Sequence, residues 1–285
     1  PCPQPSVELT AAAVRHGGMK NRFFELRGSH NPHRWNLPLN PSICVGPADG
    51  LFMYGGVGLG ASIEALERTC ERPVVWATAQ YLSFARPPSV LDLDVRIFYK
   101  GRHTTQARVS GHVGEAEIIT VNAALGERPG GAEHQWAVMP DVPRPEECER
   151  VQLWPDHGEN YNRRVELRMP KGALRRDGTP SKDGRLALWA RTVEDYEMSS
   201  SMLAIFADYV PSAIGPALGE ANSGSSSLDN TLRVRKIVTT RWVFCDIAIT
   251  GLNAGFAHGD MRLFAESGEL MATASQSMVV RSRGE

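Results

Sequence analysis

Asp208 is a carboxylate inside an apolar segment, a combination that suits general acid or base chemistry. Its neighbours along the chain include Leu203, Phe206 and Val210. Burial among such side chains disfavours the charged form of a carboxyl group, so the pKa rises towards neutral pH, where the group can both take up and release a proton. The alternative is an aspartate that faces solvent near a helix end, as most helical aspartates do.

A glycine-rich stretch suggests a second kind of chemistry. Gly55 is followed by Gly56-Val-Gly58-Leu-Gly60-Ala61, which is close to the pattern that binds the pyrophosphate of a dinucleotide. That pattern requires a preceding strand and a strand-helix-strand unit. The sequence before Gly55 is not β-branched and no such unit follows, so a nucleotide site is disfavoured.

Two further groups of residues give weak indications of a serine nucleophile and of a metal site. The run Ser225-Ser-Ser227 lacks the Gly-x-Ser-x-Gly spacing of a nucleophile elbow, so a serine hydrolase is disfavoured. His30 and His33 are three apart, but no Cys, Asp or Glu joins them at metal-ligand spacing. We expect neither a metal site nor a cofactor.

A stretch rich in proline and glycine divides the chain near its middle. Periodicity disappears between Glu127 and Pro155, as is typical of a linker between domains. We predict an N-terminal domain at 1–128, a linker at 129–160 and a C-terminal domain at 161–285.

The two halves show the same order of elements. In the first half, apolar residues at helical spacing predict a helix over 51–69. Alternating or β-branched runs then predict four strands, at 74–84, 91–99, 104–112 and 118–125. In the second half a strand at 185–191 precedes a helix over 199–214 that Ser199 and Ser200 can cap. Four strands follow it, at 226–238, 242–250, 259–265 and 270–280. One helix followed by an antiparallel meander, twice over, predicts an α+β fold with a curved sheet around each helix.

Several short motifs in this order resemble the double hot-dog acyl-CoA thioesterases of the thioesterase II type. The first half carries Met53-Tyr-Gly-Gly56, Tyr81-Leu-Ser-Phe-Ala-Arg-Pro-Pro88 and Tyr99-Lys-Gly-Arg-His-Thr104. The second half carries Phe206-Ala-Asp208, Ser227-Leu-Asp229 and Gly268-Glu-Leu-Met-Ala-Thr-Ala-Ser-Gln276. The resemblance covers roughly residues 45–126 and 163–282, and it implies two fused hot-dog domains.

The resemblance also implies a reaction and a catalytic site. Asp208, Ser227 and Gln276 match the aspartate, hydroxyl residue and glutamine that hold and activate the hydrolytic water in this family. Ser227 replaces the threonine common there and lacks the methyl group that restricts its rotamer, which puts the rate in doubt rather than the chemistry. The implied activity is hydrolysis of a fatty-acyl-CoA to free fatty acid and CoA.

The resemblance gives the glycines and some basic residues a role in substrate binding. Gly55, Gly56, Gly58 and Gly60 would allow close packing of the helix on the sheet. The exposed N–H groups at the helix start, where Gly55 and Gly56 are the expected substrate-binding residues, could face the thioester carbonyl; packing alone is the alternative. Arg86, together with Lys100 and Arg102 at another turn, could meet the phosphates of CoA, although ordinary solvated charge explains any one of them.

The composition limits the kinds of partner and the cellular location that we expect for this protein. The formal net charge is −1, from 31 basic and 32 acidic residues, so no basic excess points to nucleic acid. No apolar run reaches the roughly 20 residues that a membrane-spanning helix needs. Five scattered cysteines, without a CxxC pair, favour a reducing compartment. We therefore expect a cytoplasmic enzyme, and the resemblance adds a homodimer.

Two rival functions remain open. A hot-dog hydratase would need a histidine paired with the aspartate, and none is close to Asp208 in sequence. A non-catalytic acyl-CoA-binding protein of the same fold would have no need of both Asp208 and Gln276.

Overall fold

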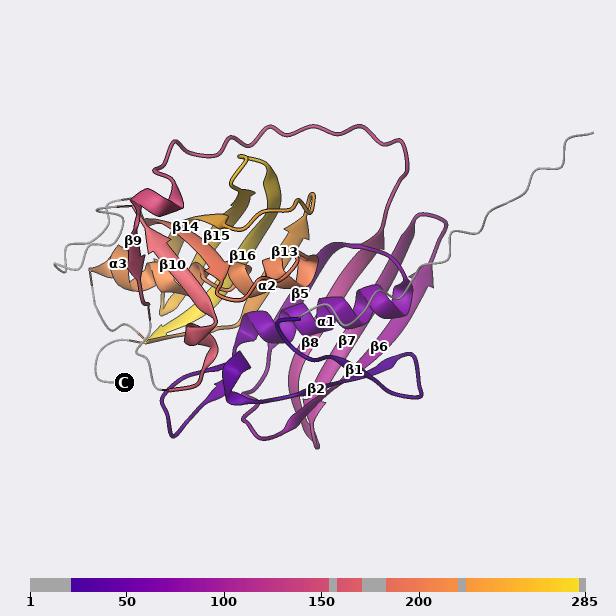
Figure 1. Cartoon of the computed structure of the whole chain (residues 1–285). Helices are drawn as coiled ribbons and strands as arrows, with labels where there is room; N and C mark the ends of the chain where they lie inside the picture. Colours follow the sequence, from indigo (N-terminus) through magenta and orange to yellow (C-terminus); the bar gives the residue numbers. More distant parts are fainter. Residues whose placement is uncertain (1–21, 154–157, 171–182, 220–223, 282–285) are drawn as a thin grey trace, which may run out of the picture.

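The computed structural model describes residues 22–153, 158–170, 183–219 and 224–281. Within these ranges fourteen strands form one continuous sheet (Figure 1), in the order β1-β2-β6-β7-β8-β5-β13-β16-β15-β14-β11-β10-β9 with β12 also on β16. All of its described strand pairs are antiparallel. The antiparallel α+β class predicted from the sequence is confirmed.

The first half of the chain supplies one long helix and its strands. Helix α1 ends where Glu71 adopts a left-handed conformation (φ 55°), just before the predicted Arg72-Pro73 stop. Its apolar side chains pack on β5 to β8, so these strands curve around it. The elements are β1 (Arg27–Gly28), β2 (Arg34–Pro38), η1 (Pro41–Ile43), β3 (Cys44–Val45), β4 (Phe52–Met53), α1 (Gly55–Cys70), β5 (Val74–Tyr81), β6 (Val90–Lys100), β7 (Thr104–Val113) and β8 (Ala116–Gly126).

The second half repeats this order around a shorter helix. Helix α2 begins at a Ser199 cap whose hydroxyl accepts from the N–H of Met202, as predicted. The elements are η2 (Pro145–Glu147), β9 (Glu149–Val151), η3 (Tyr161–Arg163), β10 (Val165–Met169), β11 (Arg185–Thr192), α2 (Ser200–Ala207), η4 (Val210–Ala213), α3 (Ile214–Leu218), β12 (Gly224–Ser227), β13 (Asp229–Val234), β14 (Val243–Asn253), β15 (Phe256–Ala265) and β16 (Leu270–Arg281).

The single helix predicted over 199–214 is wrong in one respect, because α2 stops at Ala207 and Asp208 is its C-terminal cap. Pro211 explains the break. A proline has no N–H to donate and its ring clashes with the preceding turn, so the chain continues as the 3-10 helix η4 and then as α3. Asp208 therefore lies at a helix end, as in the alternative interpretation, but it is only 7% exposed.

The two halves join through one pair of strands. Strand β5 of the first half pairs with β13 of the second, from Asp229 opposite Gln80 to Arg233 opposite Trp76. The main hydrophobic core is likewise continuous across both halves, and α1 and α2 both contribute to it. Residues from the two halves can thus meet at one site.

Two of the α1 glycines pack against helix α2 and not on the sheet as expected, whereas Gly58 lies near strand β8. A Cβ on Gly56 would come within 2.8 Å of the Ile205 carbonyl oxygen, and one on Gly60 within 2.8 Å of the Ser201 carbonyl oxygen. As the residue number rises along α1 its partner's number falls along α2, so the two helices run antiparallel. Glycine lets their backbones approach more closely than any other residue would.

The connection between β8 and η2 crosses the outside of the molecule (Figure 1). Ala137, Met139 and Val142 pack on a second, smaller apolar cluster on the sheet. That cluster consists of Cys148, Trp189, Trp242, Phe244, Phe264 and Leu270. This part of the predicted linker therefore covers a face of the second half.

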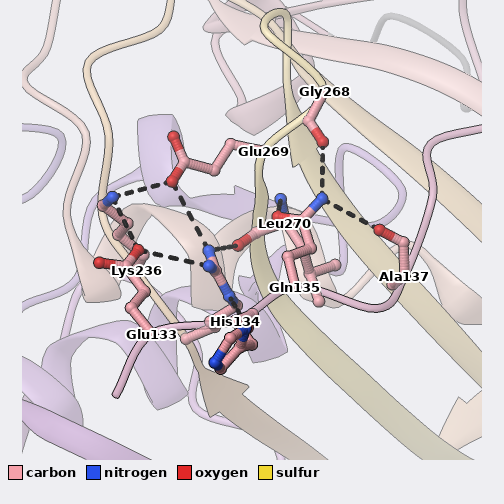
Figure 2. A network of polar contacts seen from close by, with 9 residues as sticks. Glu133, His134, Gln135, Ala137, Lys236, Gly268, Glu269 and Leu270 are labelled. Carbon is pink, nitrogen blue, oxygen red and sulfur yellow. Dashed lines mark hydrogen bonds and ion pairs between the residues drawn. The ribbon is translucent and has the colours of Figure 1, made fainter. Parts of the chain in front are cut away.

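Polar contacts fix the same connection near the β15–β16 turn (Figure 2). Gln135 accepts from the N–H of Leu270 at 2.8 Å and donates to the carbonyl of Gly268 at 3.0 Å. Glu133 pairs with Lys236 at 2.8 Å and with Arg235 at 3.3 Å. The connection is thus tied to the second half by both apolar and charged groups.

Among the described residues, 200–218 form the one helical stretch that is long and apolar enough to cross a membrane. A window of 18 residues within it has a mean hydropathy of 1.3, but 67% of that window is buried inside the protein. The stretch comprises α2, η4 and α3, which pack on the sheet, so its apolar character is that of a core element.

Candidate active site

Asp208 reaches back to the start of α1. Its Oδ2 accepts a hydrogen bond of 2.7 Å from the backbone N–H of Gly56. The first N–H groups of a helix have no partner inside it and carry a partial positive charge, so a carboxylate is stabilised there. The end of α2 is thereby fastened to the start of α1.

Gln276 connects the aspartate to the serine. Its Nε2 donates to Asp208 Oδ1 at 2.5 Å and to Ser227 Oγ at 3.0 Å. Gln276 lies on β16 and is 2% exposed, whereas Ser227 ends β12, which pairs with β16. The structure therefore brings together all three residues that the sequence singled out for catalysis.

The protonation of Asp208 is set by its surroundings. Burial raises the pKa of Asp208 from its ordinary value of 3.8 to about 7. The amide of Gln276, the N–H of Gly56 and the nearby amide of Asn230 act in the opposite direction, in that order, because they favour the carboxylate. A group balanced in this way near neutral pH can serve as a proton acceptor and then as a donor.

Gly55 packs closely against this carboxylate. A Cβ there would lie 2.8 Å from Asp208 Oδ2 and 3.1 Å from Cζ of Tyr81. Gly56, in contrast, already donates its N–H to Asp208, so that N–H does not point at a separate substrate atom in this structure. Of the two predicted substrate-binding glycines, Gly55 lies against the side chains of Asp208 and Tyr81, and Gly56 holds the carboxylate.

The basic residues expected near CoA fall into two places. Arg86 is exposed in the loop after β5, next to Ala85, whose carbonyl accepts from the N–H of Met53 at 2.8 Å. This loop therefore borders the start of α1. Lys100 and Arg102 lie on the β6–β7 hairpin at the other end of α1, roughly 20 Å along a 16-residue helix.

Two further polar residues border the site that were not singled out from the sequence for a role there. Tyr81, the last residue of β5, has a buried hydroxyl without a hydrogen-bond partner among the described residues. Asn230 on β13 is fully buried, and neither polar atom of its side chain has such a partner. Only the two-residue period of the strand, which places Asn230 on the face of Leu232, could have indicated that it points inward.

A surface cavity lies elsewhere. It measures about 450 Å³ and is lined by the second half of α1, the start of α2 and residues 22–24 and 196–199. Asp208 adjoins the opposite ends of both helices, so this cavity contains none of the three converging residues.

Comparison with known proteins identifies the family of this chain. The family model for the acyl-CoA thioesterase C-terminal domain matches residues 145–280. A solved structure of a candidate thioesterase from Novosphingobium aromaticivorans is 33% identical, with a TM-score of 0.82, over 89% of this chain and 98% of that one. The chain belongs to the thioesterase II-like family of acyl-CoA thioesterases. The family inferred from the sequence and the prediction of a thioester hydrolase are both confirmed.

More distant structures share the fold of this thioesterase. A hot-dog protein of unknown function from Alicyclobacillus acidocaldarius is 17% identical, with a TM-score of 0.78, over 90% of this chain and 96% of that one. A candidate thioesterase II from Thermobifida fusca is 18% identical, with a TM-score of 0.76, over 91% and 96%. No curated protein matches the chain in sequence.

Proposed function

We propose that Asp208 is the general base of this acyl-CoA thioesterase and activates the water that attacks the thioester. The supporting observation is the continuous set of hydrogen bonds from Gly56 through Asp208 and Gln276 to Ser227. Gln276 Oε1 is buried without a partner among the described residues, so it can accept from a water held near Ser227.

The reaction needs one proton acceptor and no covalent intermediate. Asp208 removes a proton from water as the oxygen attacks the thioester carbon, which gives a tetrahedral intermediate. The C–S bond then breaks, and the proton passes from Asp208 to the CoA sulfur. The products are the free acid and CoA, and Asp208 returns to its ionised form.

Substrate binding at the start of α1 is part of this proposal. The thioester would bind beside Asp208, where the N–H of Gly55, in the first turn of α1, is a candidate donor to the developing oxyanion. Arg86, exposed on the adjoining loop, is a candidate partner of a CoA phosphate. Gly56 contributes through Asp208, not through direct contact.

We also infer that the chain consists of two fused hot-dog domains, at 1–128 and 161–285, with the linker at 129–160. Each half has one main helix against an antiparallel meander, and β5 and β13 join the halves. The site would then combine Gly55 and Gly56 of the first domain with Asp208 and Gln276 of the second. A homodimer and a cytoplasmic location stay predictions, which light scattering and cell fractionation would test.

The hydratase alternative would require a histidine that is hydrogen-bonded to Asp208, and none of the described residues provides one. A hydratase of this fold needs a histidine beside the aspartate, but the groups that donate hydrogen bonds to Asp208 in the described part of the chain are the Gln276 amide and the Gly56 backbone N–H. The non-catalytic binder is the stronger rival, because burial and hydrogen bonding at the site would also suit a protein that only holds acyl-CoA.

The experiment is thiol release from acyl-CoAs of increasing chain length, for the wild type beside Asp208→Asn. We expect turnover by the wild type and a loss of at least about a hundredfold in the variant, as for removal of a general base. Because Asp208 must be ionised, wild-type kcat/KM should fall as pH drops below about 7. Heat stabilisation by acyl-CoA without thiol release at any chain length would favour the binder instead.

A further inference from the structure

Asn230 is the polar residue at the site whose hydrogen-bonding groups are least satisfied. Its side chain is 0% exposed, and neither Nδ2 nor Oδ1 has a partner among the described residues. A buried amide without partners destabilises the folded state, so native proteins rarely retain one without a reason. Its neighbours indicate what that reason is.

Asn230 lies at the centre of the sheet, where the two halves meet. On one side it pairs with Ala79 of β5, two residues before Tyr81. On the other side, the pairing of Thr231 with Ser275 places Asn230 directly opposite Gln276 of β16. Opposed residues of antiparallel strands point to the same face, so the amides of Asn230 and Gln276 are neighbours on the face that carries Asp208.

The pKa values of Asp208 and Tyr81 are consistent with an Asn230 amide close to both side chains. The Asn230 amide is close enough to lower the pKa of Asp208 and that of Tyr81, although burial dominates both and raises them. An amide N–H near a carboxylate favours its ionised form. Asn230 is therefore within reach of the group that the proposed reaction requires in its charged state.

We propose that Asn230 is a positioning residue for Asp208: its amide N–H hydrogen-bonds the carboxylate when Asp208 is ionised and holds it towards the water. This inference rests on the proposed function of Asp208. It assigns Gln276 and Asn230 complementary tasks, since Gln276 connects Asp208 to Ser227 and Asn230 supports the carboxylate from the β5 side.

The other titratable groups near Asp208 do not compete for this role. Tyr54, Tyr81, Tyr161 and Tyr209 surround it, and burial raises the pKa of each phenol, with the charge of Asp208 raising each further. Cys245 also has a pKa raised by burial. The Asp229 carboxylate is occupied by the N–H of Ser277 at 2.6 Å. All of these phenols and the thiol stay neutral at pH 7.

The test compares pH profiles of kcat/KM for Asn230→Leu and Asn230→Asp with those of the wild type. Leucine removes the donor, and aspartate, of nearly equal volume, places a second carboxyl group beside Asp208. Either change makes ionisation of Asp208 harder, so the acidic limb should move to higher pH by more than about half a unit. The matched control is Thr231→Val on the same strand, because the Thr231 hydroxyl contacts Thr78 at 3.0 Å on the other face.

The outcomes are distinct. The proposal is supported if the acidic limb of the kcat/KM profile moves to higher pH in the Asn230 variants but not in Thr231→Val. If every Asn230 variant that folds keeps the wild-type limb, the proposal is overturned, even where activity falls. Asn230→Asp preserves volume and serves if Asn230→Leu does not fold. Full activity of Asp208→Asn would overturn the proposed function itself, a failure distinct from an unmoved limb.

Discussion

At the scale of single residues, the site keeps a carboxylate where its charge is disfavoured. Asp208 is 7% exposed and has three groups that favour its ionised form, yet burial outweighs them and raises its pKa to about 7. Such a group is poorly placed for stability and well placed for proton transfer near neutral pH. Stability and activity should therefore respond to it in opposite directions.

Asp208→Asn should stabilise the protein in a pH-dependent way. The folded-state pKa lies above the unfolded one, so the contribution of Asp208 to wild-type stability is full below about pH 4 and is lost as pH rises through about 7. An asparagine stays neutral. We expect the variant to gain about 1–3 kcal/mol in free energy of unfolding at pH 8 and much less at pH 5, as measured by urea denaturation. An equal gain at both pH values would contradict the raised pKa.

Sequence reasoning found part of this site. Asp208, Ser227 and Gln276 were indicated by short motifs, and they converge in the structure. Asn230 was missed because its neighbours come from strands β5 and β16 and from the end of helix α2, and no local pattern records that its amide is unsatisfied. Burial of a polar strand residue depends on register, which the sequence alone does not set.

At the scale of elements, the glycines of α1 determine how closely the two helices approach. Gly56 and Gly60 face the α2 backbone, while Gly58 faces the flexible end of Met53. The sequence predicted α1 to within a few residues at its start, since its periodicity is local, but it assigned Gly56 and Gly60 to the sheet instead of to α2. Contacts between α1 and α2 depend on the tertiary arrangement, and the early end of α2 depends on Pro211.

Gly60→Ala and Gly58→Ala should differ sharply in stability. The new methyl group at position 60 would meet the Ser201 carbonyl oxygen at 2.8 Å. This oxygen belongs to the α2 backbone, so the contact can be relieved only if the whole of α2 shifts. We expect a loss of about 1–3 kcal/mol in free energy of unfolding. At position 58 the contact is the Met53 Cε, also at 2.8 Å, which can rotate away, so higher helix propensity should offset most of the cost. Equal losses in thermal or urea denaturation would refute close α1–α2 packing.

At the scale of the whole molecule, the two halves form one sheet and one main core. The sequence predicted two similar halves and a connection without regular structure. It did not predict that 137–142 would cover an apolar cluster on the second half, because Ala137, Met139 and Val142 show no periodicity. Whether such an irregular segment packs on the protein depends on the surface beside it, and that surface forms only in the folded structure.

Gln135→Ala should loosen that connection. The variant loses the bonds to Leu270, Gly268 and Ala137, so we expect faster cleavage between about 127 and 145 in limited proteolysis and a loss of about 0.5–1.5 kcal/mol. Trp136→Ala is the matched control, since the Trp136 side chain is 87% exposed and contributes little burial. Identical cleavage rates in both variants would show that Gln135 does not hold the connection in place.

The central claim is that Asp208 activates water and forms no bond to the acyl group. Its most direct test is a single turnover of acyl-CoA by excess enzyme in ¹⁸O-water, with mass analysis of the acid and of the peptide that contains Asp208. Attack by water predicts one ¹⁸O atom in the acid and none in the peptide. An unlabelled acid with ¹⁸O in Asp208 would mean that the carboxylate attacks the thioester itself, and would contradict the account.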